Sequence, residues 1–167
     1  MARLAESTGF PPIARGDARL LILGTLPSQA SLEAQQYYAH PRNAFWRIMA
    51  ELFGAGDTYA ERCQRILQHG IAVWDVLQSS VRPGSMDADI RTDTARVNDF
   101  AGFFDTHPDV AAVCFNGKKA QALYQRMVEP ATAARIASYN VLPSTSPAHA
   151  SLNFAAKLKA WRAIAQS

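Results

Sequence analysis

The stretch that decides the fold class is Arg19-Leu20-Leu21-Ile22-Leu23-Gly24. It is a short, almost purely apolar run between Gly16-Asp17 and a closing glycine, which is typical of a strand buried on both faces. Comparable runs occupy residues 71–76 and 110–115, and residues 138–142, ahead of Pro143, are expected to form a fourth strand. Strands that alternate with helices are joined by right-handed crossovers. We therefore expect an α/β fold with a mostly parallel, four-stranded sheet between helical layers.

Segments with a helical spacing of apolar residues separate these strands. Helices are expected at residues 45–53, 59–68, 97–104, 118–128 and 154–165. Residues 25–41 and the polar stretch through residues 82–85 are expected to be loops. The chain has 167 residues and no Gly/Ser-rich linker or internal repeat, so residues 1–167 are expected to form a single domain.

The composition excludes several classes of protein. No window approaches the roughly 18 consecutive apolar residues that a membrane span needs. Cys63 and Cys114 are too few for a disulfide scaffold or a four-cysteine metal site, and the four histidines show no metal-ligand spacing. We expect a cytoplasmic protein with no membrane partner, no metal and no other cofactor, and a monomer by default.

The charge is distributed unevenly along the chain. Residues 1–109 carry 10 basic and 13 acidic side chains, whereas residues 110–167 carry 7 basic side chains and only Glu129 as an acid. A basic C-terminal third fits a surface that contacts a phosphate backbone. Ordinary solvated helix faces would give the same pattern.

Ligands of parallel α/β sheets bind outside the carboxyl ends of the strands, so the loops after the four strands are the candidate sites. The first loop opens with Gly24-Thr25-Leu26-Pro27-Ser28, which is neither a Walker A motif nor a G-x-G-x-x-G fingerprint. Nucleoside triphosphate hydrolysis and a dinucleotide cofactor are therefore disfavoured. The loop continues into Tyr37-Tyr38-Ala39-His40-Pro41-Arg42-Asn43-Ala44-Phe45-Trp46. Its tyrosines could stack on a planar ring, while amides near the next helix could bind an anion.

Each residue of this aromatic loop also has a purely structural interpretation. Asn43 is a favoured N-cap residue for the helix that follows. Tyr37 and Tyr38 could form a hydrophobic lid with solvated hydroxyls. His40-Pro41 could simply fix the turn into the helix.

The last loop reads Pro143-Ser144-Thr145-Ser146-Pro147-Ala148-His149-Ala150-Ser151. Its hydroxyls and backbone amides could hold a phosphate, or it could be a proline-rich turn that ends in Ser151 as a helix N-cap. A serine hydrolase is disfavoured because the G-x-S-x-G elbow is absent. Asp75 follows a strand and is the carboxylate best placed for catalysis, and Asp87 and Asp89 lie on the next loop.

Three motifs together resemble the uracil-DNA glycosylase superfamily: Gly24-Thr25-Leu26-Pro27, Tyr38-Ala39-His40-Pro41-Arg42-Asn43-Ala44-Phe45-Trp46 and Leu142-Pro143-Ser144-Thr145-Ser146-Pro147. Within it, the chain looks most like the hypoxanthine (deoxyinosine) DNA glycosylases, with mismatch-specific uracil-DNA glycosylases as cousins. The resemblance covers about residues 19–160, and Gly117-Lys118-Lys119-Ala120 also fits it. It implies a three-layer α/β/α sandwich that flips a deaminated base out of DNA and hydrolyses its N-glycosidic bond without a metal.

Two departures favour the hypoxanthine branch. Many uracil enzymes carry a polar residue, often Asn, two positions after the first glycine, where this chain has Leu26. The mismatch-specific cousins carry Asn where this chain has Ser144. The hypoxanthine branch also lacks the first Asn and relies on the Asn of the aromatic motif, which is Asn43 here. The resemblance therefore implies Asn43 as the catalytic residue, hypoxanthine as the first substrate and uracil as the second.

The resemblance also assigns binding roles, in which Tyr38 stacks on the flipped base and Ala148 or His149 fills the space it leaves. The base-binding residues are Gly24, Thr25, Leu26, Pro27, Tyr38, His40 and Asn116. The DNA-binding residues are Arg42, Lys118, Ser144, Thr145, Ser146, Ala148 and His149. Lys118 and Lys119 are the only lysines expected near a strand end, and neither is placed for a Schiff base. We therefore expect a monofunctional glycosylase of base excision repair whose partner is DNA containing deaminated bases.

Two other classes of function stay open at this point. One is a hydrolase of free nucleosides or nucleotides that uses the same cleft. The other is a lesion-binding module that has lost catalysis, which Leu26 makes plausible.

Overall fold

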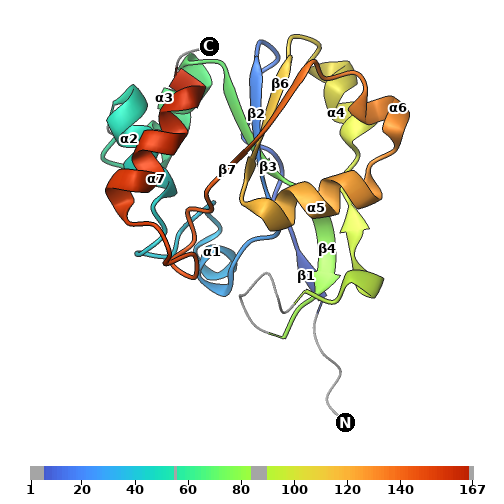
Figure 1. Cartoon of the computed structure of the whole chain (residues 1–167), viewed down its shortest axis with the longest axis horizontal. Coiled ribbons are helices and arrows are strands. Elements are labelled where there is room, and N and C mark those ends of the chain that lie inside the picture. Colours follow the sequence, from blue (N-terminus) through green and yellow to red (C-terminus); the bar gives the residue numbers. More distant parts are fainter. Residues whose placement is uncertain (1–5, 55, 84–89, 166–167) are drawn as a thin grey trace.

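The computed structural model describes residues 6–54, 56–83 and 90–165 of the chain. Its centre is a parallel sheet with the strand order β3-β2-β6-β7. The strands are β2 (Leu20–Gly24), β3 (Ile71–Asp75), β6 (Ala112–Asn116) and β7 (Ser138–Leu142). Helices cover both faces of this sheet (Figure 1). The expected three-layer α/β/α sandwich around four parallel strands is confirmed.

The helices divide into two layers, one on each side of the sheet. In Figure 1, α2, α3 and α7 lie on the left and α4, α5 and α6 on the right. The helices are α1 (Gln29–Ala34), α2 (Phe45–Phe53), α3 (Tyr59–Gln68), α4 (Phe100–Thr106), α5 (Lys118–Met127), α6 (Pro130–Ala133) and α7 (Phe154–Trp161). The described residues also include the 3₁₀ turns η2 (Thr92–Thr94) and η3 (Arg162–Ala165).

The apolar run of β2 is explained by two hydrophobic cores that share the sheet. Leu21 and Leu23 pack into the core that includes Phe103 of α4 and residues of α5. Leu20 and Ile22 point the opposite way, into the core formed with α2, α3 and α7. Because successive side chains of a strand alternate between faces, a strand covered on both sides must be apolar throughout.

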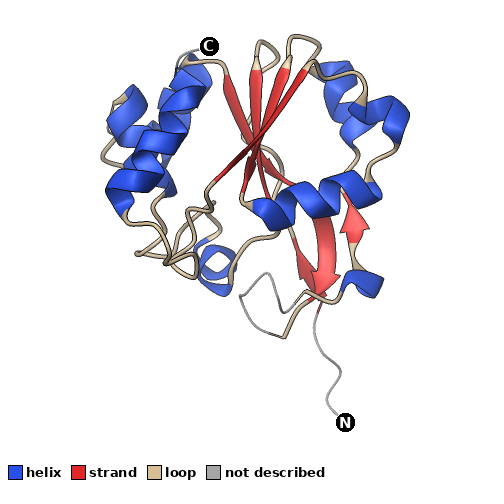
Figure 2. Cartoon of the chain, in the orientation of Figure 1, coloured by secondary structure: helices blue, strands red, loops and turns tan. Residues whose placement is uncertain are grey.

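A second, smaller sheet contradicts the expectation of loops around the parallel sheet. It is antiparallel, with the order β1-β4-β5, and consists of β1 (Glu6–Thr8), β4 (Leu77–Val81) and β5 (Arg96–Val97). Figure 2 shows its arrows below and to one side of the main sheet. Sequence analysis missed these strands because they are short and, in β4, rich in serine, which is a weak strand signal.

Several element boundaries also differ from expectation, and the strand expected at residues 110–115 spans Ala112–Asn116. Residues 25–41 are not one loop, because α1 lies within them. The helix expected at residues 97–104 begins only at Phe100, since Asp99 caps it by accepting from the Gly102 amide. The last α-helix ends at Trp161 and continues as a 3₁₀ turn to Ala165.

Two further expectations concern residues around these elements. The N-cap of α7 is Asn153, whose Oδ1 accepts from the Ala156 amide, so the alternative reading of Ser151 as the cap is wrong. Asp87 and Asp89 lie outside the described residues. Within the described ranges, no helix is both long and apolar enough to cross a membrane.

Candidate active site

A cavity of about 380 Å³ opens at the carboxyl ends of the parallel strands. The last residues of β2, β3 and β6 and the loop after β7 form part of its wall, and the loop between α1 and α2 completes it. The lining residues are Gly24, Thr25, Leu26, Pro27, Ser28, Ser31, Tyr37, Tyr38, His40, Arg42, Asn43, Asp75, Asn116, Ser144, Thr145, Ser146, Pro147 and Ala148. All three motifs that stand out in the sequence therefore meet at one cavity, whose size lies in the range of small-molecule sites.

In the turn after β2, the carbonyl groups point toward partners inside the protein, and the amide N–H groups point the opposite way. The Thr25 carbonyl accepts from the Leu77 amide at 3.1 Å, and the Pro27 carbonyl accepts from the Arg82 guanidinium. In a trans peptide the C=O and N–H groups point in opposite directions, so the N–H groups of Leu26 and Ser28 point away from β4. Within the described part of the chain, neither N–H donates to a protein group. They form a pair of donors at the cavity wall.

Gly24 allows two polar side chains to approach the start of this turn. A Cβ atom at Gly24 would lie 2.7 Å from Asp75 Oδ1 and 2.8 Å from the Tyr38 hydroxyl. Both distances are shorter than side-chain contacts permit, so only glycine leaves room for this arrangement. Asp75 is itself buried, and Gly24 is its partner in the register of β2 and β3. A carboxylate and a phenol thus face the cavity where β2 ends.

The two tyrosines of the aromatic loop have different environments. Tyr37 is buried, its hydroxyl donates to the Pro11 carbonyl at 2.8 Å, and Trp46 Nε1 donates to its carbonyl at 2.7 Å. Burial, followed by the nearby charge of Asp75, raises the pKa of Tyr37 well above its ordinary value. These contacts make Tyr37 a structural anchor of the loop.

Tyr38 is only partly buried and presents its ring at the cavity. The ring stacks on Phe45, with the centroids 4.2 Å apart and an angle of 30° between the planes. Its backbone has φ 55°, in the left-handed region that bulky residues rarely occupy. Strain of this kind costs about 1–3 kcal/mol and is concentrated at functional sites. Of the two tyrosines, Tyr38 is therefore the candidate for stacking on a planar ligand.

Asn43 shapes the start of α2 without being its N-cap. The cap position is Ala44, and Asn43 Oδ1 accepts from the Phe45 amide at 2.9 Å. This bond distinguishes the side-chain oxygen from the side-chain nitrogen, so Nδ2 points away from the Phe45 amide. Since Asn43 lines the cavity, its Nδ2 is a donor available to a ligand. The structural and the catalytic interpretations of Asn43 are compatible.

His40 and Arg42 lie on the tight turn that precedes Asn43. His40 Nδ1 accepts from the Arg42 amide at 3.1 Å, so the neutral ring carries its proton on Nε2 and can donate from there. Arg42 is exposed and borders the cavity, with its guanidinium accessible from outside. The turn thus adds a donor to the cavity and a cation to its rim.

Asn116 and Thr145 join the ends of β6 and β7. Asn116 Nδ2 donates to Thr145 Oγ1, and the Thr145 amide donates to Asn116 Oδ1, both at 2.9 Å. The Thr145 carbonyl in turn accepts from the Ala44 amide at 3.0 Å. Asn116 therefore lines the cavity mainly as a buried support for the loop after β7.

Two of the expected DNA-binding residues do not line the cavity. Lys118 is exposed in the first turn of α5, directly after Gly117. Gly117 packs so closely on the loop after β7 that a Cβ there would lie 3.1 Å from the Ser144 Cβ atom. His149 is half-buried outside the cavity, and its amide donates to the Ser146 carbonyl at 3.0 Å. Both residues lie next to segments that form the cavity wall.

The structure also places two buried cations near the cavity that sequence analysis missed. Arg82 is 3% exposed and donates to the carbonyls of Leu26 and Pro27. Lys157 is buried on α7, and its Nζ donates to the Ser146 carbonyl at 3.2 Å, so Lys118 and Lys119 are not the only lysines near a strand end. Burial lowers the pKa of Lys157. A signal for Lys157 existed, because its position lies on the same helical stripe as Phe154 and Trp161.

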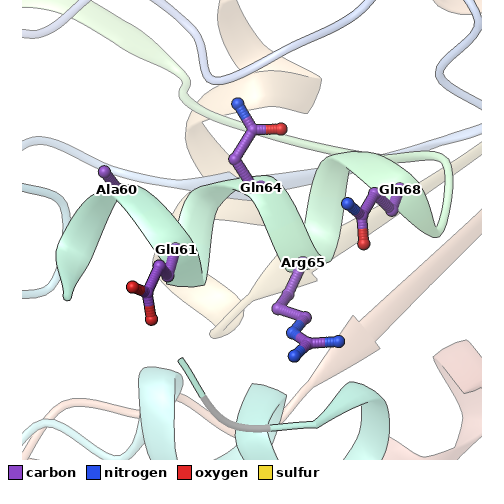
Figure 3. Close-up of a pocket in the computed structure, with 5 residues that line it drawn as sticks. All are labelled: Ala60, Glu61, Gln64, Arg65 and Gln68. Carbon is purple, nitrogen blue, oxygen red and sulfur yellow. The ribbon is translucent and has the colours of Figure 1, made fainter. Parts of the chain in front are cut away.

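A second hollow of about 400 Å³ lies along α3 and offers no comparable chemistry. Figure 3 shows its five lining residues, Ala60, Glu61, Gln64, Arg65 and Gln68, which all come from this one helix. Their side chains spread in different directions and are exposed to solvent. Among residues 6–54, 56–83 and 90–165, no three His, Cys, Asp or Glu side chains gather into a group that could hold a metal ion.

The fold and the cavity define an α/β protein with a candidate ligand-binding site at the carboxyl edge of a parallel sheet. Comparison with known proteins identifies it further. The family model of the uracil DNA glycosylase superfamily matches residues 11–165. The chain therefore belongs to the uracil DNA glycosylase superfamily.

Individual relatives agree with this membership. A hypoxanthine DNA glycosylase of Methanosarcina acetivorans is 37% identical over 144 residues, which cover 84% of this chain and 87% of the relative. A hypoxanthine DNA glycosylase of Methanosarcina barkeri is 36% identical over 118 residues, 69% of this chain and 73% of the relative. A solution NMR structure from M. acetivorans, described as a candidate uracil DNA glycosylase, matches with a TM-score of 0.78 and 32% identity over 98% of this chain and 100% of that one.

Proposed function

We propose that this protein is a monofunctional DNA glycosylase that excises hypoxanthine, and secondarily uracil, from DNA. The observation that carries the proposal is the convergence of the turn at residues 24–28, the aromatic loop at residues 37–43 and the loop at residues 144–148 on one cavity. The two Methanosarcina relatives named as hypoxanthine DNA glycosylases support the choice of base. The protein would act in the cytoplasm, at the nucleoid, as a monomer and without a cofactor.

The reaction needs stabilisation of charge more than a strong base. The bond between C1′ and the base nitrogen breaks, and its electron pair leaves with the base while the sugar becomes an oxocarbenium-like cation. Water then adds to C1′ and loses a proton, and the base anion takes up a proton. The Leu26 and Ser28 amides and Asn43 Nδ2 are preorganised donors for the negative charge that spreads over the departing base. Tyr38 would hold the flipped ring by stacking.

Asp75 gives the cavity an acceptor beside these donors, and this pairing favours deaminated bases. Hypoxanthine presents an N–H next to a carbonyl on its Watson–Crick edge, and uracil does the same. Adenine and cytosine present the reverse polarity, a bare ring nitrogen next to an amino group. A carboxylate near amide N–H groups matches the first pattern and opposes the second. The Asp75 carboxylate at Gly24 would therefore distinguish a deaminated base from its parent base.

The rim of the cavity supplies the contacts for the DNA backbone. Arg42 and Lys118 are exposed cations: Arg42 borders the cavity, and Lys118 follows Gly117, which packs on Ser144. Lys118 stands in the first turn of α5, where a cation is unfavourable for the helix dipole unless an anion is bound nearby. The hydroxyls of Ser144 and Ser146 would hold phosphates, whereas the expected Thr145 hydroxyl is buried against Asn116 and only supports the loop. Ala148 or His149 would fill the space that the flipped base leaves.

End-labelled duplexes with one deoxyinosine or one deoxyuridine test the proposal. The duplexes are incubated with the protein and treated with hot alkali, which cleaves at abasic sites. We expect cleavage at deoxyinosine, slower cleavage at deoxyuridine, and no covalent trapping by borohydride. Trapping would contradict monofunctional chemistry, and a free Lys157 amine would then be the first nucleophile to examine.

Other results would assign the cavity to a different class of function. Tight, salt-sensitive binding of deoxyinosine DNA without an abasic product would identify a binding module. Turnover of free inosine with no action on the duplex would identify a nucleoside hydrolase.

A further inference from the structure

Arg82 is a buried arginine whose side chain reaches the turn of the active site. It follows β4, the middle strand of the second sheet, and lies 55 residues from Pro27 in sequence. Nη1 donates to the Leu26 carbonyl at 3.5 Å and Nη2 to the Pro27 carbonyl. Arg82 does not line the cavity, so it acts on the turn from behind.

The contact of Arg82 Nη2 with the Pro27 carbonyl acts on a peptide group whose N–H faces the cavity. The Pro27 carbonyl and the Ser28 N–H belong to one trans peptide, and they point in opposite directions. A guanidinium at the oxygen fixes the plane of that peptide, and its hydrogen bond polarises the N–H. Because Pro27 has no N–H of its own, Ser28 and Leu26 supply the donors of the turn. Arg82 holds the carbonyl on each side of Pro27.

Arginine suits this position better than other cations. Its planar fork can bond two carbonyls at once, whereas lysine offers a single point charge. Burying a guanidinium costs free energy unless hydrogen bonds satisfy it. Its presence at this position therefore indicates that it serves a property of the protein other than stability. The turn that it holds is the segment that must remain rigid while charge develops on the base.

We propose that Arg82 is a positioning residue for base excision, which orients the turn at residues 26–28 and places positive charge behind the donor that meets the leaving base. The inference rests on the proposed glycosylase function. Arg82 would lower the barrier to bond cleavage and would not hold DNA, since its guanidinium is buried and does not line the cavity.

The test compares Arg82→Met and Arg82→Lys with the matched control Arg62→Met. Arg62 also donates to a loop carbonyl, that of Gly56 at 3.3 Å, but it lies on α3 away from the cavity. Three quantities are measured for each protein: the midpoint of thermal unfolding, the single-turnover rate on deoxyinosine duplex, and the Kd for a duplex with 2′-fluoro-deoxyinosine, which resists cleavage.

We expect Arg82→Met to lower the single-turnover rate roughly 10- to 100-fold while the Kd changes less than about threefold. Arg82→Lys keeps the charge and should recover about tenfold of that loss. Arg62→Met should cleave at the wild-type rate. The amide proton of Ser28 should also shift in the NMR spectrum of Arg82→Lys, which reports the polarised peptide directly.

Failure of the inference differs from failure of the proposed function. If the wild-type protein cleaves neither duplex, both the proposed function and the inference are overturned. Cleavage by wild type and equally fast cleavage by Arg82→Met overturns only the inference. So does a rate loss in both variants that is matched by an equal loss of affinity for the 2′-fluoro duplex, because Arg82 would then only support the fold. If Arg82→Met does not fold, the test rests on Arg82→Lys. An unchanged single-turnover rate and an unshifted Ser28 amide proton in that variant would likewise overturn the inference.

Discussion

Asn116 and Thr145 bond to each other twice, side chain to side chain and side chain to backbone, and both are almost completely buried. The pair links the end of β6 to the loop after β7. Through the Thr145 carbonyl it also holds the start of α2, because the Ala44 amide donates to that oxygen. Three segments distant in sequence thus depend on one reciprocal contact at the cavity wall.

Loss of this contact should disturb both stability and excision. Asn116→Ala leaves the buried Thr145 amide and hydroxyl without their partner, so we expect the free energy of unfolding to fall by about 1–3 kcal/mol. Excision at deoxyinosine should fall as well, since the loop that carries Ser144–Ser146 loses its support. Thr145→Ser keeps both bonds and serves as the control. Urea denaturation and single-turnover assays measure the two effects, and an Asn116→Ala protein of full stability would show the contact to be unimportant.

Asn43 allows its structural and chemical roles to be separated. Asn43→Asp keeps an oxygen for the Phe45 amide and places a negative charge at a helix N-terminus, so the fold should be retained. It removes the Nδ2 donor, and we expect excision to slow by roughly 10²-fold. Asn43→Ala loses both functions and should be slower and less stable. Rates and unfolding midpoints are compared; an aspartate variant as fast as wild type would leave Asn43 with a structural role only.

Gly24→Ala tests the close approach of Asp75 and Tyr38. The added methyl group would collide with both side chains at less than 3 Å, and their packing limits how far they can retreat. We expect the loss of most excision activity with a folded protein, because the φ of Gly24 is not in the left-handed region. Gly16→Ala is the matched control, since a Cβ there meets nothing within 4 Å. Equal activity of the two variants would argue against a role for this arrangement.

Asp75→Asn tests how the cavity distinguishes deaminated bases. The amide has the size of the carboxylate but can present either a donor or an acceptor, so the preference for an N–H on the base should weaken. We expect the ratio of excision rates for deoxyinosine over deoxyadenosine to fall by roughly tenfold or more. The measurement is single-turnover cleavage of matched duplexes that differ only at this base. An unchanged ratio would remove Asp75 from base recognition.

Tyr37 should contribute to unfolding at alkaline pH. Its pKa is raised in the folded protein, whereas the unfolded chain ionises near the ordinary value of 10.0. The unfolded state therefore loses a proton first, so the stabilisation is complete below pH 10 and is lost as the pH rises above that value. In Tyr37→Phe the decline should be shallower by up to about 1.4 kcal/mol per pH unit. Urea denaturation between pH 8 and about pH 11 measures the slopes; parallel slopes would show that Tyr37 ionises equally in both states.

The main sheet could be predicted because burial on both faces leaves a strong pattern. The run at Leu20–Gly24 has no polar residue, and its neighbours β3 and β6 are nearly as apolar. The second sheet could not be predicted, since β5 has two residues and β4 contains Ser79 and Ser80. These serines are buried by tertiary contacts, such as that of Ser80 Oγ with the Arg91 carbonyl, which no local pattern reveals.

The candidate site was predictable to the extent that its residues lie in continuous motifs. The turn follows strand β2, and the aromatic loop precedes helix α2. The topology alone therefore brings both segments to the carboxyl edge of the sheet. Arg82 was not predictable, because an arginine after a polar stretch is normally solvated and only the path of β4 turns it inward. Asp75 was named from its place after a strand, but the approach of both Asp75 and Tyr38 to Gly24 depends on the three-dimensional arrangement.

The cavity takes part of its wall from the last residues of β2, β3 and β6 and from the loop after β7, as far as Ala148. No fragment that lacks β7 can hold the base, however well its other strands pair. During synthesis, the growing chain can therefore assemble this cavity only after the loop at residues 144–148 has left the ribosome. Pairing of β7 with β6 and completion of the cavity would then arise in the same step of folding.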